Sequence, residues 1–132
     1  MTVTGGCMCG AVRYTAEGTP EHNALCHCTE CRRAAGAPMV GWALFAREQV
    51  TITGTPASYN SSGDIARQFC GTCGTGLFYL SETIFPGKID IPTGTFDDPD
   101  ALAPSACIQL ADAPAWIATV AELPKFDRYP GM

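Results

Sequence analysis

Three cysteines crowd one short stretch of the sequence, "LCHCTECRRAAG", at residues 25–36. As thiolates, Cys26, Cys28 and Cys31 could hold a zinc ion and leave its fourth position open, which is the arrangement of a catalytic zinc. A distant fourth ligand would instead close the site, and the cluster could also bind no stable metal. The spacing alone leaves these three interpretations open.

Two cysteine pairs lie outside this stretch. "GCMCG" contains Cys7 and Cys9, and "FCGTCGTG" contains Cys70 and Cys73 in the C-x-x-C pattern of a zinc knuckle. A structural zinc needs four ligands, so we expect the pairs to form one four-cysteine site that ties the N-terminus to the middle of the chain. A thioredoxin-like redox motif is the weaker interpretation, because that motif opens a helix, whereas this pair joins two expected strands.

Composition limits the classes of function. The 132 residues are 46% hydrophobic and 16% charged, which is typical of one globular domain. The net charge of −5 argues against nucleic acid and against an anionic membrane surface as partners. No apolar run has the roughly 20 residues of a membrane helix, and the start lacks the features of a signal peptide. We therefore expect a cytoplasmic protein with reduced thiols, in which eight cysteines indicate metal rather than disulfides.

Short strands and turns must position the cysteines. Alternating or continuous apolar residues between Gly-rich turns predict a mainly β domain. The expected strands lie in residues 10–18, 37–46, 49–54, 65–69, 76–80, 88–91 and 107–110. Residues 59–64 are expected to form a turn, residues 96–104 are a candidate for one helical turn, and the aromatic residues of the C-terminal tail, Trp116, Phe126 and Tyr129, are expected to pack against the sheet.

One helix is predicted from its end signals. Thr29 is the expected N-cap of "ECRRAA", and Gly36 is the expected residue just past the C-terminus. Cys31 then falls in the first turn, where the helix dipole would lower the pKa of its thiol. The adjacent Arg32 and Arg33 would add positive charge.

Three motifs in order, "GGCMCGAVRY", "CHCTECRRAAGAP" and "FCGTCGTGLF", closely resemble the glutathione-dependent formaldehyde-activating enzyme family, which includes the centromere protein V-like proteins. The tail "PAWIATVAELPKFDRYP" is also similar to the end of that family. The resemblance implies a small zinc-stabilised domain over residues 1–132, built of short antiparallel β-strands with one or two short helices. It also implies structural zinc ligands at the two cysteine pairs and a second, catalytic zinc at Cys26, Cys28 and Cys31.

The activity implied by the resemblance is a carbon–sulfur lyase reaction run in reverse, in which formaldehyde and glutathione form S-hydroxymethylglutathione. Zinc would bind the thiol as thiolate or polarise the aldehyde oxygen. Arg32 and Arg33 are candidates for binding the glutathione carboxylates, although a solvated helix face would have the same residues. Because thiols add to formaldehyde unaided, two alternatives stay open: a non-catalytic carrier of glutathione or aldehyde, and a structural zinc module that docks a protein partner.

Four other polar residues have less specific interpretations. Glu30 is expected to be an exposed first-turn acid, with proton transfer as its alternative role. His27 is expected to be structural rather than a proton carrier, and His22 to lie on the surface. Members of the family often have His where this sequence has Cys107; we expect a small buried residue there, or else a thiol near the second metal. The physiological thiol, the aldehyde and the oligomeric state are not determined by the sequence.

Overall fold

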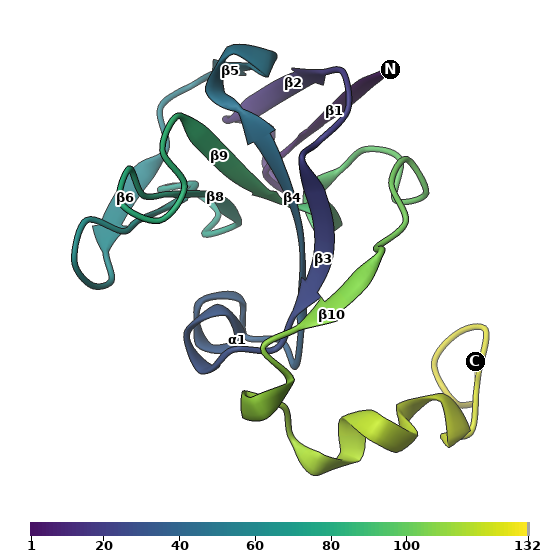
Figure 1. Ribbon diagram of the computed structural model, residues 1–132. Coiled ribbons are helices and arrows are strands. Elements are labelled where there is room, and N and C mark those ends of the chain that lie inside the picture. The colour runs from purple at the N-terminus through teal and green to yellow at the C-terminus, as the bar shows by residue number, and fades with distance from the viewer. Residues whose placement is uncertain (132) are drawn as a thin grey trace.

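The computed structural model describes residues 1–131, which form two β-sheets. The smaller, antiparallel sheet has the order β1-β2-β5, with strands β1 (Thr2–Gly6), β2 (Arg13–Glu17) and β5 (Val50–Thr53). The larger sheet has the order β10-β3-β4-β9-β8-β7-β6 (Figure 1). Its strands are β3 (His22–Cys26), β4 (Val40–Ala46), β6 (Ala57–Asn60), β7 (Ala66–Phe69), β8 (Gly76–Leu80), β9 (Lys88–Pro92) and β10 (Ala106–Ile108).

These sheets confirm the expected mainly β fold of short strands, but β1, β3 and β6 were not expected. The strand expected at residues 107–110 is the short β10, and it pairs with β3 in parallel, whereas the other pairs within the described residues are antiparallel. Residues 96–104 contain turns and bends rather than the helical turn considered from the sequence. Short 3-10 helices occupy Arg47–Gln49 (η1) and Thr93–Thr95 (η2).

The main core lies between the two sheets. Phe45, Ile89 and Phe78 project from one face of the larger sheet and are almost fully buried together with Val3 and Tyr14 of the smaller sheet. The rings of Tyr14 and Phe78 meet edge to face with centroids 5.8 Å apart. Because side chains alternate along a strand, this packing leaves the opposite face of the larger sheet available for a site.

Strand register places a row of side chains on that opposite face, and all of them except Leu44 have a polar group. His22 pairs with Leu44, Leu44 with Asp90, Asp90 with Tyr79, and Tyr79 with Arg67. Directly paired residues of neighbouring strands lie on the same side of a sheet. This row therefore crosses β3, β4, β9, β8 and β7 on the face away from the main core.

Helix α1 (Thr29–Ala35) follows β3. Its N-cap is Cys28, not the expected Thr29, because the Cys28 sulfur accepts the backbone N–H of Cys31 at 3.3 Å. Gly36 ends the helix in the left-handed conformation with φ 64°, as the sequence predicted. The correction matters for chemistry, because one sulfur atom serves both the helix cap and the cysteine cluster.

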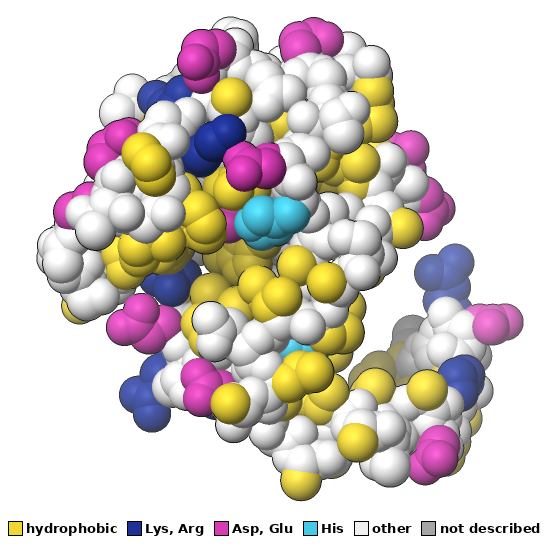
Figure 2. All heavy atoms as spheres, in the orientation of Figure 1, with side chains coloured by type: hydrophobic (Ala, Val, Ile, Leu, Met, Phe, Trp, Pro, Cys, Tyr) yellow, Lys and Arg dark blue, Asp and Glu magenta, His cyan; other side chains and the backbone are white. Residues whose placement is uncertain are grey.

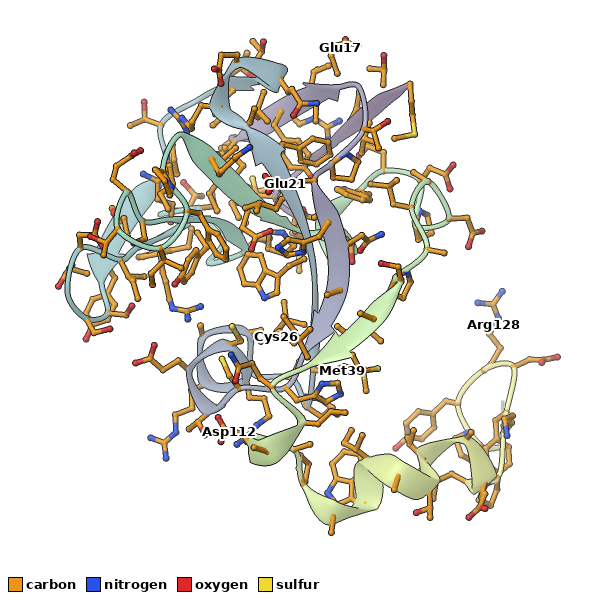
Figure 3. All side chains as sticks on the ribbon, viewed as in Figure 1. Glu17, Glu21, Cys26, Met39, Asp112 and Arg128 are labelled. Carbon is orange, nitrogen blue, oxygen red and sulfur yellow. The ribbon has the colours of Figure 1, made fainter. Side chains whose placement is uncertain are left out.

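The C-terminal tail leaves the fold beside α1. It contains η3 (Leu110–Asp112) and η4 (Ala115–Glu122) and extends away from both sheets, with Arg128 far from them (Figures 1 and 3). Arg32 of α1 donates to the Asp112 carbonyl at 3.4 Å, where the tail passes the helix. The expectation that its aromatic residues pack against the sheet is wrong, since Trp116, Phe126 and Tyr129 are all exposed.

None of the helices in the described residues is long and apolar enough to cross a membrane.

Candidate metal centres

The first cysteine cluster joins two distant loops. Cys7 and Cys9 follow β1, and Cys70 and Cys73 lie in the turn between β7 and β8. The four sulfur atoms all lie within 4.8 Å of one another, with 3.6 Å between Cys7 and Cys9 and 3.7 Å between Cys9 and Cys70. Tetrahedral zinc with Zn–S bonds of about 2.3 Å separates its sulfurs by about 3.8 Å. The residues therefore fit a structural zinc.

Backbone and hydroxyl donors favour the thiolate at Cys7 and Cys73 of this cluster. At Cys9 the backbone hydrogen bond from Ala11 lowers the pKa, but the neighbouring Cys7 thiol and burial outweigh it, so the pKa is raised to about 11. The N–H of Val12 donates to the Cys7 sulfur at 3.3 Å, and this bond lowers the pKa of that thiol. The Thr75 hydroxyl lies 3.2 Å from the Cys73 sulfur, and hydrogen bonds from Thr75 lower the pKa of Cys73 to about 5. Gly74 has φ 81°, a conformation that lets the C-x-x-C turn close around a metal.

The second cluster is built where β3 runs into α1. Cys26 ends β3 beside the helix (Figure 3), Cys28 caps the helix, and Cys31 lies in its first turn. Their three sulfurs also lie within 4.8 Å of one another. No fourth Cys, His, Asp or Glu joins this group among residues 1–131. Three thiolates would leave one of the four ligand positions of a zinc ion free, so they fit the donor set of an open zinc site.

The pKa shifts in this second cluster differ from the expectation for Cys31. Burial raises the pKa of the Cys31 thiol to about 12, which outweighs the seven-residue helix that was expected to lower it. At Cys28, burial raises the pKa, but the N–H of Cys31 and the neighbouring thiols outweigh it, so the net pKa is lowered. A cation at the cluster would favour the thiolate at all three positions.

Arg67 provides such a positive charge. Its guanidinium nitrogens lie 3.7 and 3.8 Å from the Cys31 sulfur, and the group stacks on the Tyr79 ring with 5.0 Å from its Cζ to the centroid. It also pairs with Glu30 at 3.7 Å. Arg67 was not singled out from the sequence. Its position in the expected strand 65–69 was visible, but its approach to Cys31 depends on how the strands pair.

A cavity of about 260 Å³ lies on the open face of the larger sheet, which is the face that points away from the main core. We call it the thiol cavity. All three cysteines of the second cluster line it. Figure 2 shows a hollow that has the sheets on one side and the segment with α1 on the other, and hydrophobic side chains surround it. The other lining residues include His22, Glu30, Trp42, Arg67, Tyr79, Phe85, Asp90 and Ile108.

A second, larger cavity of about 440 Å³ lies next to the first. The two share Cys31, Trp42 and Arg67 in their linings. We call it the glycine-rich cavity, because Gly41, Gly74, Gly76 and Gly94 contribute to its wall. Because glycine has no side chain, a ligand can approach the backbone closely at these positions.

Arg32 and Arg33 line neither cavity. Arg32 donates to the His27 carbonyl at 3.2 Å, to the Thr29 hydroxyl and to Asp112, so it holds the helix and the start of the tail together. Arg33 is exposed. Their predicted contact with substrate carboxylates stays a prediction, and Arg67 is the arginine that lies beside the thiols.

Three residues had only general expectations from the sequence. His27 is 1% exposed and its Nδ1 lies 3.1 Å from the Ile108 carbonyl, in keeping with a structural role. His22, expected on the surface, is half-buried and lines the thiol cavity. Cys107 is exposed, which corrects the expectation of burial, and it belongs to neither metal-ligating group.

The chain is similar to known proteins over most of its length. A family model described as glutathione-dependent formaldehyde-activating enzyme matches residues 2–112 and leaves the tail outside. An uncharacterized lyase of Schizosaccharomyces pombe is 29% identical over 75 residues, which is 57% of this chain. The matched region spans only 55% of that protein.

A solved structure has the same fold. The crystal structure of a Rhodobacter sphaeroides protein, a structural genomics target, matches with a TM-score of 0.61 over 79% of this chain and 98% of its own. Its sequence is 22% identical, so the likeness concerns the fold alone.

Proposed function

Because the chain belongs to the glutathione-dependent formaldehyde-activating enzyme family, we propose that it is a zinc-dependent carbon–sulfur lyase of that type. As a single domain, it would join a thiol such as glutathione to formaldehyde or a small aldehyde and cleave the S-hydroxymethyl adduct in reverse. In the forward direction the sulfur–carbon bond forms, the carbonyl π bond breaks, and the thiol proton is replaced by a proton on oxygen.

The convergence of three thiols on the wall of an accessible cavity carries this proposal. A structural cluster has no need of adjoining space, whereas a reactive one must admit a substrate. The first cluster offers four sulfurs, enough to close a site, and the second offers three. The donor sets thus support one structural and one catalytic zinc.

The protein's own residues would bind and orient the reactants. A zinc ion held by Cys26, Cys28 and Cys31 would supply Lewis acidity and stabilise a thiolate. Arg67 adds positive charge beside Cys31, which favours an anionic sulfur at the same place. Trp42 is 8% exposed and gives both cavities a shared apolar surface.

The glycine-rich cavity is the better place for the larger thiol, and the thiol cavity for the aldehyde. The substitution Gly94→Leu tests this division, because Gly94 lines the glycine-rich cavity and a Cβ built there meets no atom within 4 Å, so the cavity wall can take a larger side chain without a steric clash. We expect KM for glutathione to rise about tenfold, equivalent to about 1.4 kcal/mol of lost binding, with an unchanged melting temperature.

Steady-state kinetics with varied glutathione provide this measurement. Glu48→Leu is the matched control, since Glu48 is an exposed residue of the 3-10 helix η1 and lines neither cavity. An unchanged KM in Gly94→Leu would move the thiol out of the glycine-rich cavity.

The function itself is tested by exchange NMR with 13C-formaldehyde and glutathione. Catalysis should speed exchange between hydrated formaldehyde and the S-hydroxymethyl adduct, in proportion to protein concentration and saturably in both reactants. Binding without faster exchange would favour the carrier. Neither binding nor exchange by zinc-replete protein would overturn the enzymatic proposal and favour a docking module.

A further inference from the structure

Asp90 is a buried carboxyl group without a partner. Its residue on β9 is 6% exposed, and its Oδ1 accepts no hydrogen bond from residues 1–131. Burial alone raises the pKa of Asp90 to about 7. Buried acids are normally paired or hydrogen-bonded, because an uncompensated charge in a protein interior is costly. An exception of this kind in a cavity calls for a functional explanation.

The position of Asp90 supplies one. It lies on the open face of the larger sheet, between its strand partners Leu44 and Tyr79. It lines the same cavity as the cysteines of the second cluster. Tyr79 forms ring contacts with Trp42 and Phe85, at centroid distances of 6.0 and 6.2 Å, so the carboxyl group adjoins an aromatic wall.

The charged side chains that share this face of the sheet with Asp90 form their ion pairs with other groups. Lys88, two residues away on the same face of β9, pairs with Glu21 at 2.7 Å. Arg67 lies one strand beyond Tyr79 and interacts with Glu30 and the Cys31 sulfur.

The remaining neighbours leave Asp90 equally free. Tyr79 on β8 has a raised pKa, with burial as the main cause, and therefore stays neutral. On β3, His22 packs on Phe85 with centroids 6.2 Å apart, and Leu44 and Trp42 on β4 have no charge. The register thus keeps a carboxyl group free in the cavity.

We propose that Asp90 is a catalytic acid, which gives its proton to the aldehyde oxygen as the thiol adds to the carbonyl carbon. This rests on the proposed function. The sulfur–carbon bond forms, the π pair moves to oxygen, and that oxygen takes the Asp90 proton. The thiol proton passes to solvent, and a solvent proton restores Asp90. In the reverse direction, the Asp90 carboxylate removes the hydroxyl proton as the carbon–sulfur bond breaks.

The chemistry favours this role over a passive one. A general acid works best when its pKa lies near the working pH, and proton transfer by a positioned side chain contributes about 100-fold or more to rate. Formaldehyde is small enough for the 260 Å³ cavity that holds both the thiols and the acid. No oxidant or reductant is required.

Asp90→Asn tests the proposal, because asparagine keeps the shape and cannot donate the acidic proton. We expect kcat for adduct formation to fall about 100-fold, with KM for glutathione, zinc content and fold unchanged. In the wild type, kcat should decline as pH rises through about 7, and this limb should vanish in Asp90→Asn. Glu48→Gln, an acid-to-amide change at an exposed residue outside both cavities, should behave as wild type.

A second measurement is independent of activity. The pKa of Asp90 in the folded protein is raised from 3.8, so folded protein binds the extra proton between about 4 and 7. The stability of wild type relative to Asp90→Asn should therefore fall as pH rises through this window, because only wild type holds this extra proton in the folded state. The melting temperature of each protein, followed from about pH 4 to about pH 8, gives the comparison.

The outcomes separate the two proposals. If wild type is active and kcat of Asp90→Asn stays within about threefold of the wild-type value at every pH, the role of Asp90 is overturned and the proposed function stands. If the melting temperatures of wild type and Asp90→Asn change equally with pH, the role of Asp90 is also overturned, because Asp90 would then not hold its proton. Absence of wild-type turnover would overturn both, beginning with the proposed function.

Discussion

Cys9→Ala is expected to unfold the protein or to lower its stability by several kcal/mol, although Cys9 is exposed. An exposed side chain normally contributes about 0.5 kcal/mol or less. Cys9 differs because its sulfur lies 3.7 Å from that of Cys70, across the link between the N-terminal loop and the β7–β8 turn. A structural zinc contributes about 10 kcal/mol or more to folding in small domains, which is comparable to the whole stability of a protein.

Cys107→Ala is the matched control, because Cys107 is also exposed but belongs to neither cluster. Its melting temperature, followed by circular dichroism on zinc-replete protein, should stay within a few degrees of wild type. Chelators should destabilise wild type and Cys107→Ala alike and affect Cys9→Ala much less. Equal melting temperatures for the two variants would argue against a structural metal at the first cluster.

The cysteine clusters were predictable because metal ligands come as closely spaced pairs and triplets. Within each loop the spacing fixes which sulfurs converge, so Cys70 and Cys73 needed no knowledge of the sheets. The pairing of the two loops followed from counting ligands. The same reasoning predicted the end of α1 at Gly36, since only local backbone geometry decides it.

Arg67 and Asp90 could not be placed in this way. Their positions depend on the register of β7, β8 and β9, which brings together residues far apart in the chain. A signal was present in "KIDI", where a charged residue interrupts an apolar strand. It indicates an unusual acid but not the cavity that surrounds it.

Other errors have similar physical causes. Residues 59 and 60 of strand β6, "ASYN", were assigned to a turn because Asn, Ser and Gly favour turns, but an edge strand can be polar on both faces. The aromatic residues of the tail indicated burial, yet Trp116 is 52% exposed. Hydrophobicity measures a tendency to leave water and does not identify the surface that is covered.

Cys28→Ser is expected to cause a large loss of turnover while keeping the fold. Cys28 has two roles, because its sulfur caps α1 by accepting the Cys31 N–H at 3.3 Å and is also one of three converging thiols. Serine is among the best N-caps, so Cys28→Ser keeps the helix, whereas Cys28→Ala would lose about 1 kcal/mol through the cap alone. The hydroxyl is a poor zinc ligand, and the second cluster would be left with two thiols.

Elemental analysis of protein made under reducing, zinc-replete conditions should therefore find about two zinc ions per chain in wild type and about one in Cys28→Ser. Loss of partners outside the ligand set already costs about 10–100-fold in other zinc enzymes, so we expect loss of a ligand to lower kcat by at least about 100-fold. Cys107→Ala should keep both zinc ions and full activity. One zinc in wild type, or undiminished turnover in Cys28→Ser, would contradict a catalytic metal at the triplet. Because the serine variant keeps the helix cap, loss of activity with an unchanged melting temperature would assign the effect to the thiol as a ligand.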